Sequence, residues 1–430
     1  MTDRLDNSNT ELPDSAEYEP DVDAKPSLLD SRALRYTALA LAGLLLLSIV
    51  QAISGTTELT SSGTWAAAIR LAIPIMLAGL GGLFSERAGV VNIGLEGMMI
   101  AGTWFGAWAG WSFGPWYGVL FGVLGGAIFG LIHAIATVTF AVDHIVSGVA
   151  INILAAGSMR YLSVVTYSPE SGGGATQSPR IKSPIGTFDV PLLSDAFNWI
   201  EDQAIFFISD VAGLLAGFTT RMSWLTLVTL LIVPLTWWVL WRTAWGLRLR
   251  SCGENPYAAE SLGVSVLKMK YYGVVISGGL AGLGGAYLVV VQAGIYREGM
   301  TAGRGYIGLA SLIFGNWYPF GVAAGASVFG YADALSLRQG TAVHALLLVA
   351  AIALALLMAW SIYSKKMTAA AIQGGAAAFF LLWYMMTDTV ATQVIAALPY
   401  IVTLLVLSLA TQRLRMPAAD GLRYRKGEAV

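Results

Sequence analysis

From Arg35 onward the chain is a succession of long apolar runs separated by short polar stretches. A helix needs about 20 apolar residues to cross the hydrocarbon core of a bilayer, and runs of this length recur along the chain. Helices are expected because lipid offers no water to unpaired backbone groups, and the alternating pattern of barrel strands is absent. We predict ten spanning helices, at residues 35–54, 65–84, 91–110, 117–140, 145–165, 223–242, 271–292, 344–364, 370–387 and 393–411.

One further apolar stretch, between residues 305 and 335, is broken around residues 315–319 by Gly, Asn and Pro. It predicts either two short helices or one re-entrant piece followed by one span. With it, the sequence predicts an all-α, polytopic helical bundle of about ten to twelve transmembrane spans. Composition agrees, because only 12% of the residues are charged, against about 25% in soluble proteins. The formal net charge of -1 argues against a nucleic-acid binder built on a basic patch.

The distribution of charged residues predicts the domain organisation and the orientation. Residues 243–270 and the C-terminal residues 412–430 are rich in Lys and Arg, which favours the cytoplasm for both. Counting spans from them places residues 1–34 in the cytoplasm too, and the long segment 166–222 outside the cell. Residues 1–34 carry nine acidic and three basic side chains, which predicts a disordered tail. The transmembrane domain is therefore expected at 35–411, in a multi-pass protein of the cell membrane with both termini cytoplasmic.

Small residues at four-residue spacing mark two of the predicted spans. They are Gly122, Gly126 and Gly130 in one, and Gly278, Gly282 and Ala286 in the other. Such ladders let helix backbones approach closely. We interpret them as helix packing within one subunit; a lining for a transport path is the alternative.

Polar and charged residues cluster at the start of the predicted span 91–110. Glu86 and Arg87 precede it and fit a cytoplasmic turn, whereas Asn92 and Glu96 fall inside it, one helical turn apart and so on one face. Glycines nearby weaken the helix, and unwound stretches at membrane depth are tolerated where they face a cavity. We therefore predict Asn92 and Glu96 as candidates for lining a substrate path; purely structural hydrogen bonding is the alternative.

The predicted cytoplasmic loop contains a short helix of its own. Asn255 and Pro256 are a helix-start signal, and Gly263 is a plausible stop. Such a helix could receive force from a separate motor or act as a structural elbow between spans. The single cysteine, Cys252, permits no internal disulfide or thiolate metal cluster, and we expect it in an ordinary loop.

Four motifs together resemble one known family. The run Glu86–Met99 resembles the signature of permeases of nucleoside and simple-sugar ABC importers, within the superfamily of ribose and branched-chain amino acid permeases. Further matches are Gly246–Gly263, Gly303–Pro319 and Phe329–Leu335, in the same order and spacing. The resemblance covers roughly residues 65–411.

The resemblance implies a permease subunit that passes nucleosides or related simple sugars by alternating access, driven by a partner ATPase. It implies an ABC ATPase, a second permease subunit (a paralogue or an identical copy) and an extracytoplasmic substrate-binding protein as partners, besides membrane lipid, and no nucleic acid. By the same resemblance, the residues that couple to the ATPase are Gly253, Glu254, Asn255, Ala258, Ala259, Leu262 and Gly263.

Several kinds of site are missing from the sequence. No G-x-x-x-x-G-K-[ST] phosphate loop occurs, so ATP hydrolysis, with its ATP and Mg, is expected on a separate chain, and no cofactor is expected here. The three histidines lack metal-ligand spacing, and no nucleophile elbow is present, so we predict no metal site and no enzyme. The alternative function is an ion-coupled secondary transporter of a small polar solute, for which Glu96 would be the best buried carboxylate.

Overall fold

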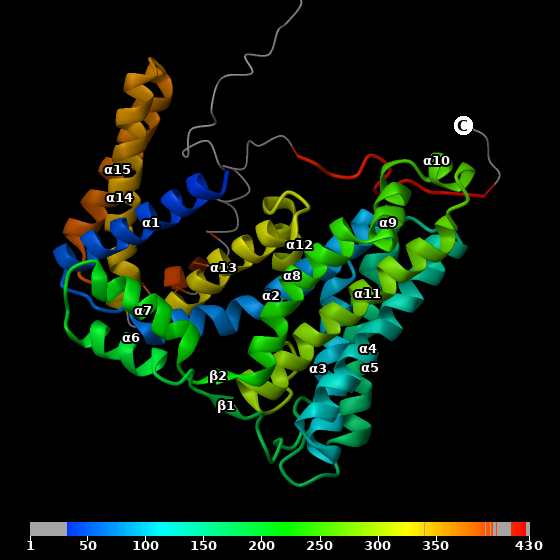
Figure 1. The fold of residues 1–430 in the computed structure, drawn as a ribbon. Coiled ribbons are helices and arrows are strands. Elements are labelled where there is room, and N and C mark those ends of the chain that lie inside the picture. The colour runs from blue at the N-terminus through cyan, green and yellow to red at the C-terminus, as the bar shows by residue number, and fades with distance from the viewer. Residues whose placement is uncertain are drawn as a thin grey trace, which may run out of the picture.

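The computed structural model describes residues 32–338, 340–391, 393–395, 397–398, 401 and 414–426. Eight helices in this part of the chain are long and apolar enough to cross a membrane, which makes the chain a multi-pass membrane protein (Figure 1). They are α1 Arg32–Ser54, α2 Ser62–Arg87, α4 Pro115–Ala134 with its π-helical extension η2 Ile135–Thr139, α5 His144–Thr166, α8 Trp224–Arg242, α11 Val266–Tyr287 with its extension η3 Leu288–Ala293, α14 Gly340–Tyr363 and α15 Met367–Met386.

The remaining helices are shorter or more polar. They are α3 Leu95–Phe113, α6 Leu193–Asp202, α7 Ile208–Thr219, α9 Ala244–Glu254, α10 Pro256–Ser261, α12 Arg304–Phe314 and α13 Pro319–Ser336. A two-stranded antiparallel ribbon joins β1 Thr187–Phe188 to β2 Met222–Ser223, with Thr187 opposite Ser223. The ribbon and the pair α9–α10 lie at opposite ends of α8 (Figure 1).

The predicted all-α membrane fold is confirmed. Eight predicted spans coincide with the eight long helices, and the largest difference is at α11, expected from residue 271 and found from Val266. The predicted span 91–110 corresponds to α3, which begins only at Leu95. The predicted span 393–411 falls largely outside the described residues, as do residues 1–31 of the predicted tail. The count of ten to twelve spans therefore stays a prediction.

The broken stretch forms two helices. α12 ends at Phe314, and α13 begins at Pro319, whose missing N–H suits the first turn of a helix. Between them Asn316 and Trp317 both adopt left-handed backbone angles, with φ of 53° and 54°. With eleven residues, α12 is about 16 Å long and too short to cross the bilayer alone.

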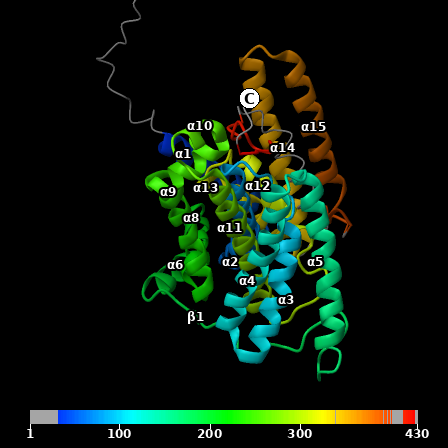
Figure 2. The ribbon, with the colours of Figure 1, turned by 90° about the vertical axis from the view of Figure 1, so that its right-hand side faces the viewer.

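The centre of the molecule is built from α2 and α11, which are the most buried of the eight long helices. Figures 1 and 2 show α3 and α4 beside α11, and the glycine ladders lie at these contacts. A Cβ atom at Gly126 would stand 2.2 Å from the carbonyl oxygen of Gly278, and one at Gly282 would stand 2.3 Å from that of Gly122. The ladders thus pack against each other within one subunit, as predicted.

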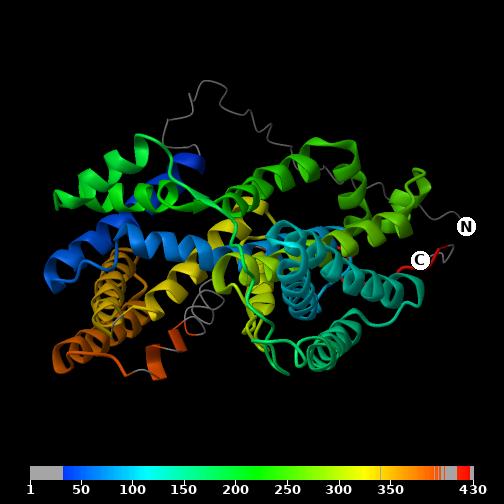
Figure 3. The same cartoon turned by 90° about the horizontal axis from the view of Figure 1, so that it is seen from below.

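The hairpin of α14 and α15 stands at the periphery. It packs against α1, at the opposite side of the molecule from α4 and α5 (Figures 1 and 3). In the most apolar part of α15 only about a tenth of the residues are buried, against 78% in α2 and α11.

Candidate functional site

The segment between α2 and α3 is irregular rather than helical. Gly89 takes a left-handed angle of φ 80° just after α2 ends, and α3 begins only after Gly94. The prediction that Asn92 and Glu96 share one helix face is therefore wrong, because Asn92 precedes the helix. An unwound stretch beside these two residues, expected from the glycines, is present.

Asn92 is fully buried and ties this segment to the neighbouring helices. Its amide donates to the hydroxyl oxygen of Ser277 on α11 at 2.9 Å. Next to it, the Val91 N–H donates to Nδ1 of His144 at 3.3 Å, and the Val91 carbonyl lies 3.3 Å from Nε2 of His133. The Asn92 side chain thus makes a structural hydrogen bond in the buried interior between α3 and α11. Its place on a substrate path stays a prediction.

Glu96 joins α3 to α12. Its side chain is buried, with 7% exposed, and its two oxygens accept from the N–H groups of Gly303 at 3.0 Å and Gly305 at 2.7 Å. These groups belong to the N-terminus of α12, where free N–H groups and the helix dipole favour an anion. Because α12 is about 16 Å long, the carboxylate lies well away from the α12–α13 turn. A path-lining role for Glu96 likewise stays a prediction.

A polar surface that the sequence did not reveal lies directly beyond Glu96. We define the α5 face as Asn152 and Arg160 of α5 with Glu298 and Tyr306 from the region of α12. The Asn152 side chain accepts from the Gly97 N–H at 2.7 Å and donates to the Tyr306 hydroxyl at 2.9 Å. Arg160 and Glu298 form an ion pair in which both side chains stay nearly half exposed, at 45% and 42%.

An exposed ion pair that includes a membrane-helix residue is a functional signal: Arg160 lies in α5, and Glu298 lies in the loop between η3 and α12. Charges facing lipid are costly, so such groups normally face a water-filled cavity or another chain. Along the same helix lies a shallow, mostly apolar surface depression, lined by Ile153, Leu154, Gly157, Ser158, Tyr161 and Leu162. The α5 face therefore needs water or a second subunit in front of it. Arg160 and Asn152 inside the predicted span 145–165 were the available sequence signal.

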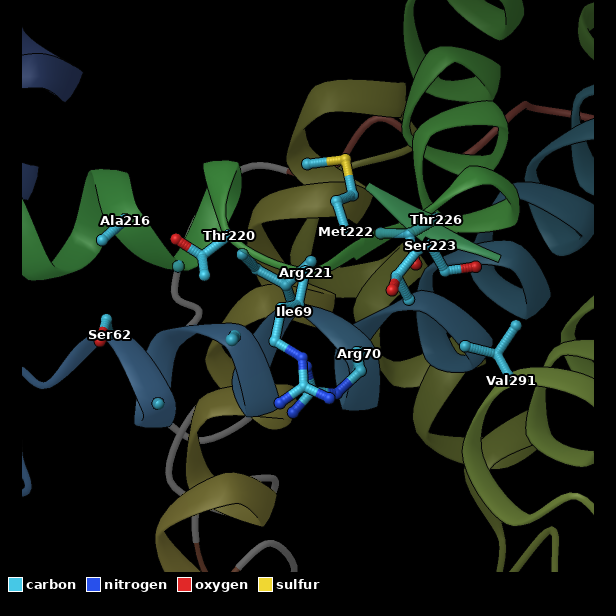
Figure 4. A pocket seen from close by; sticks show the side chains of 14 residues that line it. Ser62, Ile69, Arg70, Ala216, Thr220, Arg221, Met222, Ser223, Thr226 and Val291 are labelled. Carbon is cyan, nitrogen blue, oxygen red and sulfur yellow. The ribbon is translucent and has the colours of Figure 1, made fainter. Parts of the chain in front are cut away.

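A cavity of about 440 Å³ lies at the β1–β2 end of the molecule (Figure 4). Arg70 of α2 and Arg221 before β2 both reach into it, as Figure 4 shows. Hydroxyl groups supply much of the rest of its lining: Ser62, Thr187, Thr220, Ser223 and Thr226. The lining includes no acidic side chain among the described residues, so the cavity offers hydrogen-bond donors to a polar or anionic group.

The predicted short helix is present as α10. The side-chain oxygen of Asn255 accepts from the Ala258 N–H at 3.0 Å, Pro256 occupies the first turn, and Gly263 follows with φ 81°. Leu262 exposes 84% of its surface at the end of this helix. Together they form a small protrusion at the end of the molecule opposite the β ribbon (Figure 1).

The predicted coupling residues divide into an inner and an outer group. Gly253 and Ala259 are buried, and a Cβ at Gly253 would meet the Arg87 carbonyl oxygen at 2.4 Å. Glu254 lies 3.5 Å from the Arg87 guanidinium. The outer group is exposed and consists of Asn255, Ala258, Leu262 and Gly263. Gly253 and Glu254 thus touch the end of α2, while the outer group is exposed and can meet another protein.

Cys252 does not lie in a loop, contrary to expectation. It is fully buried within α9, because one face of that short helix packs on Ala259 and Val266. Burial raises the pKa of its thiol to about 11. No group of three or more His, Cys, Asp or Glu side chains in the described part of the chain is placed to hold a metal ion.

Comparison with known proteins adds two findings. The family model described as the permease component of branched-chain amino acid transport systems matches residues 64–360. The guanosine ABC transporter permease protein NupQ of Bacillus subtilis (strain 168) is 38% identical over 278 residues, which cover 62% of this chain and 79% of the relative.

Two further relatives are similar over comparable lengths. The nucleoside ABC transporter permease protein NupC of Lactococcus lactis subsp. cremoris (strain MG1363) is 34% identical, covering 62% of this chain and 80% of its own. A putative glucose ABC transporter permease protein, TsgC13 of Haloferax volcanii, is 31% identical, covering 65% of this chain and 78% of its own. No solved structure shows a significant match.

Proposed function

The chain belongs to the permease family of branched-chain amino acid transport systems, and from that premise we propose that its own cargo is a nucleoside. It is the transmembrane subunit of an ATP-binding-cassette importer and not an enzyme, since ATP is hydrolysed by a separate subunit in this family. Similarity to the guanosine and nucleoside permeases supports the choice of cargo over a free sugar.

The α5 face is the observation that carries this proposal. A nucleoside is uncharged but bears many donors and acceptors on its base and ribose. The amide of Asn152, the hydroxyl of Tyr306 and the Arg160–Glu298 pair present both kinds of group where α5 meets α12 and the loop before it. Such a surface can replace part of the hydration shell of a polar solute as it crosses.

Permeases of this family work with ATPase and substrate-binding partners. We propose that the ATPase, which carries ATP and Mg, contacts the exposed outer group at α10. A second permease subunit, identical or paralogous, faces the α5 face, and the binding protein docks beside the Arg70 and Arg221 cavity. No cofactor is proposed for this chain itself, and lipid surrounds its apolar helices.

The proposed orientation follows the basic residues. The α9–α10 end carries Arg248 and Arg250, and the C-terminal segment carries Arg423 and Arg425, which favours the cytoplasm for both termini. The segment 166–222, with α6 and α7, is then extracytoplasmic. Cysteine-accessibility labelling in the α6–α7 segment and at α10 from outside intact cells tests this, since only the α6–α7 segment should react.

Uptake of labelled uridine, adenosine and guanosine by cells with and without the chain tests the cargo. We expect deletion to abolish nucleoside uptake, with unlabelled ribose and leucine failing to compete in the parent cells. Loss of ribose or leucine uptake instead would overturn the nucleoside assignment. Uptake should also fail on ATP depletion and survive an ionophore; the opposite pattern would indicate ion-coupled transport.

A further inference from the structure

The C-terminal residues 414–426, which we call the strap, lie across the α9–α10 end of the molecule (Figure 1, red). The strap is outside residues 64–360, to which the family model matches. Its backbone nevertheless bonds to two separate parts of the chain, the α12–α13 turn and the end of α9. The Arg415 N–H donates to the side-chain oxygen of Asn316 at 2.6 Å, and the Ala419 N–H donates to the Gly253 carbonyl at 2.9 Å.

The strap also contacts the coupling segment through side chains. The Ala418 N–H lies 3.2 Å from a carboxylate oxygen of Glu254. Tyr424 is buried, and its ring centre lies 5.3 Å from that of Tyr257 on α10. The strap therefore contacts both Glu254 at the end of α9 and Tyr257 on α10, the helix that is proposed to meet the ATPase.

Asp420 lies buried in the middle of the strap. Only 9% of the residue is exposed, and its carboxyl group faces the Glu86 carboxyl and, at longer range, the Lys270 ammonium group. Lys270 in turn donates to the Gly89 carbonyl at 2.8 Å. Burial, followed by the neighbouring Glu86, raises the pKa of Asp420 to about 9. The strap thus inserts an acidic side chain beneath the ends of α2 and α11.

Close backbone contact fixes where the strap can lie. A Cβ atom at Gly89 would stand 3.3 Å from the Ala419 carbonyl oxygen, and Gly89 already needs its left-handed angle. Ala419 itself is buried between Gly89 and Gly253. A larger side chain at position 419 has no room, whereas Leu422, three residues on, is 60% exposed.

We propose that the strap is part of the coupling machinery: with Ala419 packed between Gly89 and Gly253, it ties α10 to the α2–α3 and α12–α13 turns, so that movement of α10 reaches α2 and α12 together. This rests on the proposed function, in which α10 receives the ATPase. α12 ends at the turn held by Arg415 and begins at the N–H groups held by Glu96. A displacement of that turn is therefore passed along one short helix to the edge of the α5 face.

The test compares Ala419→Trp with the matched control Leu422→Trp in the assembled transporter, reconstituted in proteoliposomes. The measurement is nucleoside transported per ATP hydrolysed. We expect Ala419→Trp to lower this ratio at least fivefold while membrane insertion and ATPase co-purification remain, and Leu422→Trp to match the unmodified protein. Normal coupling in Ala419→Trp would overturn the proposal.

A second variant separates coupling from folding. A chain ending at residue 413 should show the same loss, and a synthetic peptide of residues 412–430 added to the strap-less transporter should restore at least half of the ratio. A peptide without effect would overturn the proposal, because the strap acts through its contacts with Asn316, Gly253 and Tyr257. If the unmodified transporter itself shows no ATP-driven nucleoside uptake, the proposed function fails rather than the strap.

Discussion

The α2–α11 interior and the α14–α15 hairpin are both membrane helices, but they are held in opposite ways. In the interior, glycines remove side chains so that carbonyl groups and Cα atoms of neighbouring helices touch. In the hairpin, large side chains such as Leu382 and Met385 point outward and most of the surface is exposed. The close packing of the interior therefore depends on residues without side chains. We expect a side chain added there to destabilise the fold, whereas the hairpin should tolerate one.

The largest effect is expected from a side chain added to the interior. In Gly282→Val the new Cβ would stand 2.3 Å from the Gly122 carbonyl oxygen, so two backbones must separate. We expect at least about 3 kcal/mol of destabilisation, seen as loss of folded protein in detergent. The matched control is Gly375→Val on α15, where no atom lies within 4 Å of the new Cβ. Equal loss in both variants would contradict the contrast.

A buried and an exposed carboxylate give the next comparison. Glu96→Ala leaves the N–H groups of Gly303 and Gly305 without their acceptor, and we expect about 3 kcal/mol of lost stability. Glu298→Ala removes a half-exposed partner and should cost less than about 1 kcal/mol. Thermal unfolding of both variants measures the difference. A smaller loss for Glu96→Ala would show that its hydrogen bonds do not hold α12.

The strap lies outside residues 64–360, to which the family model matches, yet its Asp420 is buried like the residues of the interior. Its docked state raises the pKa of Asp420 from the ordinary 3.8 to about 9, so docking is strongest below pH 4 and weakens as pH rises toward 9. The groups facing it are Glu86 and Arg87 on α2 and Lys270 on α11. Docking should weaken by up to about tenfold per pH unit between 6 and 8.

Hydrogen exchange at residues 418–421, compared at each pH with Asp420→Asn, measures this docking. The comparison cancels the intrinsic pH dependence of exchange. We expect protection in the unmodified strap to fall with rising pH relative to the variant, which carries no titrating group at position 420. If the ratio of protection between the unmodified strap and Asp420→Asn stays constant from pH 6 to 8, Asp420 is not the group whose titration weakens docking.

The smallest effect on stability is expected at the α5 face. Double-mutant analysis of Arg160→Gln and Glu298→Gln should give a pairing energy of about 0.2–1 kcal/mol, as for other exposed ion pairs. The same variants should lower nucleoside uptake severalfold, because they remove charged groups from the proposed path. If uptake and stability are both unchanged, the Arg160–Glu298 pair is a surface contact without a role in transport.

Most of the helices were predictable, because each needs only a local run of apolar residues. Asn92 and Glu96 were placed on one helix because the sequence does not show that Gly89 turns the chain out of α2. The α5 face was missed because Arg160 and Glu298 are far apart in sequence and meet only when α5 packs near α12. The coupling residues were identified by family resemblance alone, and their contact with an ATPase stays a prediction.

The position of the strap is a different kind of omission. Its basic composition predicts only a cytoplasmic tail, since nothing local indicates that Asp420 and Tyr424 would be buried. Burial there depends on Gly253, Lys270 and Tyr257, which come from three other parts of the chain. Tertiary contacts of this kind follow from no periodicity or spacing.

The one native thiol makes this protein convenient for spectroscopy. Cys252 is enclosed within α9 and holds its proton at neutral pH, whereas thiol reagents attack exposed thiolates. The unmodified chain should thus stay unlabelled by a maleimide dye or spin label while folded. A single cysteine introduced at Leu262, or a pair placed on the strap and α10, would then carry the only probes, and distances could be followed through a transport cycle without first removing the natural residue.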